Sequence, residues 1–77
     1  MLRIKKNVNL TQLEKFGFKK EEGYYLFADG YDDDFISYYD TIEIDLACKE
    51  LKICSINNEI IEDMIYNLIE AGLVEKV

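Results

Sequence analysis

The chain has 77 residues, 49% of them hydrophobic, and this length and composition favour one small folded domain over residues 1–77 and exclude a disordered tail. The formal net charge is −7, and histidine is absent. An acidic chain is a poor candidate for binding nucleic acid directly. At this size the core is modest, and a partner subunit often contributes to stability.

The charges are distributed unevenly along the chain. Residues 1–20 carry six basic side chains and one acidic one, whereas residues 21–48 carry nine acidic side chains and no basic one. The simplest interpretation is a solvated acidic surface. The alternatives are a surface for a basic partner and mimicry of a nucleic-acid backbone.

The sequence predicts a cytoplasmic protein. No apolar run approaches the roughly 20 residues of a membrane span, and the basic first residues lack the apolar core of a signal peptide. Cys48 and Cys54 lie at the tip and along one strand of the hairpin predicted below, about 20 Å apart. That separation is too long for a disulfide, so we expect both thiols to be free. We also expect no membrane contact and no cofactor.

The first predicted elements are a short strand and a short helix. Residues 2–6 alternate apolar and basic side chains, as a strand does. Asn9 and Gln12 resemble a capping box that opens a helix over residues 10–16, and Gly17 is suited to end it in the left-handed conformation. We expect residues 19–23 to be a connection.

The next predicted elements are two strands rich in aromatic residues. Residues 24–28 form the first, and we place a loop over residues 29–33 because it keeps most of the aspartates in water. The second continues over residues 36–46, with a bulge or break at Asp40. A single helical turn over residues 34–39 is the alternative. The expected pairs are Ala28 with Asp34, Leu26 with Ile36, and Tyr24 with Tyr38.

Residues 41–47 and 50–56 are predicted to form the clearest hairpin. Its turn at residues 48–49 places Leu46 opposite Leu51 and Ile44 opposite Ile53. A four-residue loop over residues 47–50 is the alternative, and it would keep the same register and the same side chains on each face of the hairpin. The apolar face of this hairpin is the expected seat of the long helix described next.

Residues 57–73 predict one long amphipathic helix, because apolar residues recur every three or four positions. Asn57 or Asn58 is suited to cap its start. Gly72 falls where a left-handed residue ends a helix, with Leu73 folding back on Leu68. Residues 73–77 add a short strand or fray.

These elements predict a small α+β domain. We expect a three- to four-stranded antiparallel sheet, a short N-terminal helix, and a long C-terminal amphipathic helix packed on one face of the sheet.

A metal site is not expected, although Asp29, Asp32, Asp33 and Asp34 gather within six residues. Hard cations favour such carboxylates, but the spacing fails the calcium-loop pattern of an EF-hand. Two cysteines without histidine do not complete a structural zinc site. Catalysis is not predicted either, because no base is placed beside a cysteine and no nucleotide or hydrolase motif occurs.

The most suggestive feature is the outer face of the aromatic hairpin. If Tyr24, Leu26, Ile36 and Tyr38 face the core, then Tyr25, Phe27, Phe35 and Tyr39 point away from it, beside the acidic loop. Exposed aromatic residues are typical anchors of protein interfaces. The alternative is that the N-terminal helix covers this face through Leu10, Leu13 and Phe16.

Residues 4–19, IKKNVNLTQLEKFGFK, the tyrosines that follow them, and residues 68–77, LIEAGLVEKV, resemble short uncharacterised proteins of phages and prophages in low-GC Gram-positive bacteria. The resemblance implies a small accessory protein without an assigned activity. It transfers no site residues.

Three hypotheses for function follow. The first is a non-enzymatic protein-interaction module of phage or prophage type. The second is an acidic decoy that mimics DNA and binds a host DNA-binding protein. The third is a purely structural or self-associating domain, for example a homodimer paired through an edge strand. The candidate partner-binding residues of the first hypothesis are Tyr25, Phe27, Asp29, Asp32, Asp33, Asp34, Phe35 and Tyr39.

Overall fold

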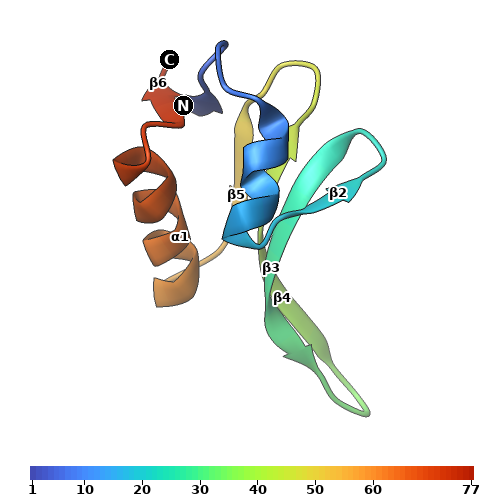
Figure 1. The fold of residues 1–77 in the computed structure, drawn as a ribbon. Coiled ribbons are helices and arrows are strands. Elements are labelled where there is room, and N and C mark those ends of the chain that lie inside the picture. The colour runs from blue at the N-terminus through green and yellow to red at the C-terminus, as the bar shows by residue number, and fades with distance from the viewer.

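A computed structural model describes residues 1–77 as an α+β fold with two antiparallel sheets and two helices (Figure 1). The predicted class and the antiparallel sheet are confirmed. There is one more strand than predicted, because residues 19–21 form a strand instead of a connection. In chain order the elements are β1 (Leu2–Ile4), the 3-10 helix η1 (Leu10–Phe16), β2 (Lys19–Glu21), β3 (Tyr24–Asp32), β4 (Ser37–Asp45), β5 (Leu51–Cys54), α1 (Glu59–Glu70) and β6 (Val74–Lys76).

The larger sheet has the strand order β2-β3-β4-β5, and each strand is antiparallel to its neighbours. β1 and β6 form a separate pair, so the two ends of the chain lie together (Figure 1). The backbone N–H of Ile4 donates to the carbonyl of Lys49 at 2.8 Å and joins this pair to the larger sheet. Of the two alternatives for residues 73–77, the short strand is therefore confirmed.

η1 has the predicted bounds and cap residues, but its geometry is that of a 3-10 helix, and Asn9 caps it through Thr11 instead of in the predicted capping box with Gln12. The Asn9 side chain accepts a hydrogen bond from the N–H of Thr11 at 3.0 Å. Gly17 ends the helix at φ 94°, and the N–H of Phe18 then donates to the carbonyl of Leu13 at 3.2 Å. This return brings Phe18 back to the core beside Leu13.

α1 lies within the predicted helical segment but is shorter than predicted, covering Glu59–Glu70 instead of residues 57–73, with its cap at Asn58. The Asn58 side chain accepts from the N–H groups of Ile60 at 2.9 Å and Ile61 at 3.2 Å. At the other end Gly72 has φ 75°, and the N–H of Leu73 donates to the carbonyl of Leu68 at 3.1 Å. Neither helix has the length and apolar character that crossing a bilayer requires.

The register of β3 against β4 differs from the prediction. Ala28 lies opposite Thr41 instead of Asp34, so the turn falls at residues 33–36 and the predicted loop over residues 29–33 is wrong. β4 passes through Asp40 as a regular strand, without the predicted bulge or the alternative helical turn. This register is seven residues away from the prediction, and an odd shift turns the opposite face of a strand toward the core.

The hairpin of β4 and β5 keeps its predicted faces. Ile44 lies opposite Leu51 instead of Ile53, a shift of two residues, and an even shift leaves every side chain on the same face. Ile42 and Ile44 are accordingly buried in the core. The loop is longer than predicted, and Lys49 in it takes the left-handed conformation at φ 63°.

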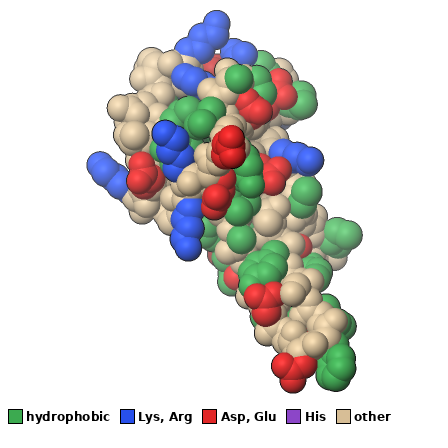
Figure 2. All heavy atoms as spheres, turned by 90° about the vertical axis from the view of Figure 1, so that its right-hand side faces the viewer, with side chains coloured by type: hydrophobic (Ala, Val, Ile, Leu, Met, Phe, Trp, Pro, Cys, Tyr) green, Lys and Arg blue, Asp and Glu red, His purple; other side chains and the backbone are tan.

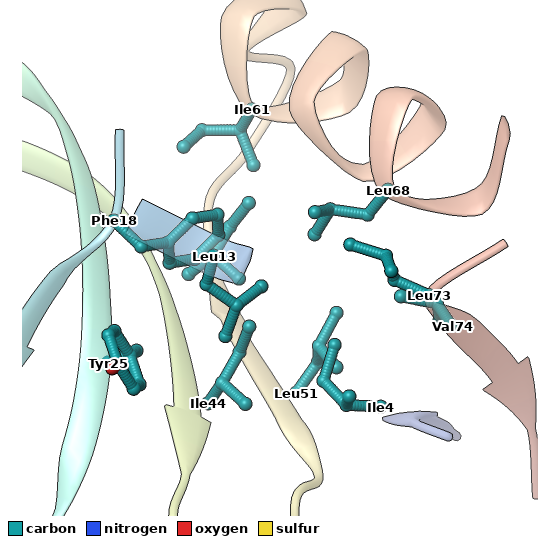
Figure 3. Close-up of a cluster of buried hydrophobic side chains, with 11 residues drawn as sticks. Ile4, Leu13, Phe18, Tyr25, Ile44, Leu51, Ile61, Leu68, Leu73 and Val74 are labelled. Atoms are coloured by element: carbon teal, nitrogen blue, oxygen red, sulfur yellow. The ribbon is translucent and has the colours of Figure 1, made fainter. Parts of the chain in front are cut away.

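The core lies where the two helices and the strand pair meet one face of the larger sheet. Figure 3 shows Leu68 of α1 pointing toward Leu13 of η1, with Ile44 on the sheet side of the cluster. No core residue comes from β3 beyond Tyr25 or from β4 before Ile42. The distal ends of these two strands therefore leave the packed body. The full cluster is Ile4, Leu13, Phe18, Tyr25, Ile42, Ile44, Leu51, Ile61, Leu68, Leu73 and Val74.

Candidate interaction site on the projecting hairpin

Residues 29–40, the distal half of the β3–β4 hairpin, form a two-stranded arm that projects from the body (Figure 1). Pairing of β2 with β3 extends no farther toward the arm than Leu26, and pairing of β5 with β4 extends no farther than Thr41. Neither flanking strand therefore lies beside the arm. The principal extents of the molecule, 43 × 26 × 21 Å, reflect this projection. A ribbon of two strands without a core beneath it depends on local contacts for its order.

The root of the arm is fixed by a polar cluster. Asp29 and Asp40 lie directly opposite each other, and the side-chain amide of Asn58 donates to Asp29 Oδ2 at 3.0 Å and to Asp40 Oδ2 at 2.6 Å. The Tyr38 hydroxyl donates to Asp40 Oδ1 at 2.9 Å. Asp40 is only 6% exposed, and these donors satisfy its carboxylate in place of water.

The tip of the arm is a turn closed by Asp33. Its N–H donates to the carbonyl of Ile36 at 2.9 Å, and its carboxylate accepts from the N–H groups of Phe35 at 2.8 Å and Ile36 at 2.6 Å. These two backbone donors hold the pKa of Asp33 below its ordinary value, the Phe35 N–H contributing most. The ionised carboxylate therefore stabilises this turn.

Two further contacts brace the arm across its strands. The Tyr39 hydroxyl donates to Asp32 Oδ2 at 2.8 Å. The hydroxyls of Ser37 and Tyr39 lower the pKa of Asp32, and the hydrogen bond to Asp32 raises the pKa of Tyr39. On the other face the rings of Tyr31 and Tyr38 lie 6.2 Å apart as a tilted cross-strand pair.

Gly30 allows the two strands of the arm to approach closely. A Cβ atom at this position would meet the carbonyl oxygen of Tyr38 and lie 2.7 Å from the Cα of Tyr39. Both obstacles are backbone atoms, which do not swing aside as a side chain does. Only glycine fits here, because any larger residue would place its Cβ against the backbone of the opposite strand.

The arm exposes large apolar side chains beside its acidic ones. Phe35 at the tip is 96% exposed and Ile36 is 59% exposed. All charged residues of the arm are aspartates, and Figure 2 shows its apolar and acidic side chains with no lysine or arginine among them. The exposed apolar set is Tyr31, Phe35, Ile36, Tyr38 and Tyr39.

A shallow depression lies where the arm meets the start of α1. Tyr38 and Asp40 line it from β4, and Ile56, Glu59 and Ile60 line it from the other side. Ile56 is 82% exposed and Ile60 is also exposed. Two exposed apolar side chains of the body, Ile56 and Ile60, therefore lie beside the root of the arm, in a depression whose other lining residues are mainly polar.

The predicted outward orientation of Tyr25 and Phe27 is wrong. Tyr25 is 2% exposed and donates its hydroxyl to Glu14 Oε2 at 3.3 Å. Burial, with the Glu14 charge beside it, raises the pKa of Tyr25. Phe27 is partly buried, and its ring lies 5.5 Å from that of Phe18. The alternative, in which the N-terminal helix covers this face through Leu10, Leu13 and Phe16, agrees with the packing of these residues on the core, and Phe18 after the helix adds to the cover.

The other candidate residues all lie on the arm. Asp29 sits at the root and is held by Asn58, while Asp32, Asp33, Asp34, Phe35 and Tyr39 are exposed along the ribbon and its tip. The prediction missed Tyr31, Ile36 and Tyr38 as surface residues. The periodicity assigns Ile36 and Tyr38 to the core because they continue the phase of Ile42. The available signal was Asp40, a charged residue in the same phase that marks where this face leaves the core.

The structure brings together few groups for other chemistry. No cluster of three or more histidine, cysteine, aspartate or glutamate side chains is placed to hold a metal ion. Cys48 and Cys54 are both free and exposed. A second depression on the opposite face of the larger sheet is lined by Tyr24, Glu43 and Lys52, a mixed and open surface.

Comparisons of the chain with protein-family models, with curated proteins and with solved structures gave no match.

Proposed function

We propose that this chain is a non-enzymatic protein-interaction module and that the arm contacts the partner protein. The observation that supports this most is the exposure of Phe35 and Ile36 at the tip of the arm. Neither side chain belongs to the core, so folding leaves nearly all of Phe35 and more than half of Ile36 in water. Aromatic and aliphatic anchors of this kind contribute most to binding when a partner removes them from water.

The charge of the arm favours a partner with a basic surface. The tip carries Asp32, Asp33 and Asp34 side by side, and there is no positive side chain within residues 21–48. Complementary charge accelerates encounter and selects among partners more than it adds affinity. The apolar anchors and the aspartates therefore have separate roles, the first in affinity and the second in selection.

The acidic decoy and the homodimer stay predictions. The geometry does not favour the decoy, because several carboxylates are engaged within the chain. Asp33 accepts from its own turn, and Asp45 accepts from the N–H groups of Ala47 and Cys48 at 2.7 Å and 3.0 Å. A decoy needs such oxygens free and spaced like phosphates.

The proposal is tested by affinity capture from a lysate of a low-GC Gram-positive bacterium, with three baits. The first is the chain itself, and the second carries Phe35→Ser and Ile36→Ser. The third carries Tyr66→Ser, which alters an exposed aromatic residue on α1 as a matched control. We expect the same protein to be captured by the first and third baits and lost from the second.

The washes separate the hypotheses. Capture through the arm tip withstands raised salt, because burial of apolar surface is not screened. Capture that disappears with salt, is displaced by duplex DNA and is unaffected by the tip substitutions would replace this proposal with the decoy.

A further inference from the structure

The arm has a vacant strand position along the outer edge of β4. β5 pairs with β4 only as far as Cys54, opposite Thr41. The chain then turns away through residues 55–58 into α1. The place beside Ser37 and Tyr39, in line with β5, is consequently unfilled.

The backbone groups of Ser37 and Tyr39 point into that position. In an antiparallel ladder, successive residues direct their N–H and C=O groups to opposite sides. The N–H of Asp45 donates toward β5, to the carbonyl of Glu50 at 3.2 Å, and the carbonyl of Ile36 accepts from β3. Residues 37, 39, 41, 43 and 45 thus face the β5 side, and the first two have no strand there.

The side chains around this edge suit a long cationic residue. On one face is the depression lined by Tyr38 and Ile60, with the exposed acidic residue Glu59 beside them. On the other face is Tyr39 with Asp32. A lysine or arginine stem packs on aromatic and aliphatic surface while its charged end reaches a carboxylate.

We infer that the outer edge of β4 at Ser37–Tyr39 accepts an extended, lysine- or arginine-bearing segment of a partner protein as an added β-strand. This inference rests on the proposed function and specifies how the partner is bound. Strand addition supplies main-chain hydrogen bonds, and alternate side chains supply specificity. A second copy of the arm is a poorer occupant, because pairing two arms sets aspartates against aspartates.

The test titrates the isotopically labelled chain, observed by NMR, with a short end-blocked peptide of alternating lysine and threonine. A peptide with glutamate in place of lysine is the charge control. A third peptide is N-methylated at two adjacent central residues, so that a methyl group meets β4 in either phase. We expect binding by the lysine peptide alone, with slowed amide exchange at Ser37 and Tyr39.

Proline substitutions separate the two edges of the arm. Tyr39→Pro removes an outward N–H and leaves the β3–β4 bonds in place, so it should weaken binding at least about tenfold relative to Tyr39→Ala. Ala28→Pro makes the equivalent change on the opposite edge, since Ala28 faces away from β4. It should leave binding unchanged. Amide exchange at Tyr31 and Tyr38, which face each other, shows that the arm remains formed.

The outcomes are distinct. Absence of binding, equal binding of the N-methylated peptide, or no difference between Tyr39→Pro and Tyr39→Ala would overturn the inference. Slowed exchange at Ser37 and Tyr39 that grows with protein concentration alone would assign the edge to a second copy. If the tip substitutions abolish capture from the lysate while Tyr39→Pro does not, the proposed function stands and only strand addition fails.

Discussion

The side-chain amide of Asn58 donates to Asp40 at 2.6 Å while its carbonyl oxygen caps α1 through the N–H of Ile60 at 2.9 Å. One residue thus joins the start of the helix to the root of the arm. Two carboxylates directly opposite each other on adjacent strands would repel. Asn58 offsets that repulsion by donating to both, and the arm leaves the body in a fixed direction as a result.

Replacing Asn58 with alanine should destabilise the whole chain. The change removes the helix cap and leaves the buried carboxylate of Asp40 with fewer donors, so we expect a loss of about 1–3 kcal/mol in the free energy of unfolding. Chemical denaturation monitored by circular dichroism measures it. The control is Asn57→Gly, which preserves a left-handed residue at φ 53° beside the cap and should be nearly neutral. If both variants are equally stable, Asn58 does not stabilise the helix start and the Asp40 carboxylate as described.

Truncating two tyrosines should distinguish the two faces of the hairpin. Tyr25 lies in the core and Tyr39 is exposed. We expect Tyr25→Ala to lower the melting temperature by about 10–20 °C, because it opens a large cavity. Tyr39→Ala should lower it by no more than about 5 °C. The reverse order, in thermal denaturation, would restore the predicted register and refute the observed one.

Adding one methyl group at Gly30 should disturb the arm and spare the body. Gly30→Ala forces the Tyr38 carbonyl and the Tyr39 Cα apart, with an expected cost of about 1–3 kcal/mol in local stability. Amide exchange should quicken at Tyr31 and Tyr38 while core amides such as that of Ile44 stay protected. Gly23→Ala is the contrasting change, strained at φ 88° but with open space around it. Its effect should stay at the β2–β3 turn.

Acid should loosen the turn at the tip of the arm. Because the pKa of Asp33 in the folded chain is below its ordinary value of 3.8, the turn has its full stability above that value. The stability is lost as pH falls through the lower, folded-state pKa. Amide shifts of Phe35 and Ile36 should move in that range. Asp33→Asn keeps an acceptor oxygen without a charge, so these shifts should no longer follow pH there.

Local signals predict much of this fold. Asn9, Gly17, Asn58 and Gly72 each have a single favourable role at a helix end, and the structure uses them in those roles. The faces of β4 and β5 also follow from alternation, since an even error in register leaves them unchanged. These features depend on neighbours within a few residues, which is why the sequence alone predicts them.

The candidate site is less predictable because its register depends on a distant partner. A hairpin that opposes Asp29 with Asp40 is unfavourable on local reasoning, and it becomes favourable only when Asn58 donates to both. The residue lies 18 positions beyond Asp40 along the chain. The exposed position of Tyr38 likewise depends on where the core ends, which periodicity along one strand does not show.

Site-specific photocrosslinking tests most directly whether the tip of the arm contacts a partner protein. A photoreactive phenylalanine analogue is placed at Phe35 on the arm, or at Tyr66 on α1 as the control, and each chain is irradiated in the same bacterial lysate. We expect one crosslinked protein from position 35, competed away by unmodified chain, and none from position 66. Crosslinking from position 66 alone would place the partner on α1 and contradict this expectation.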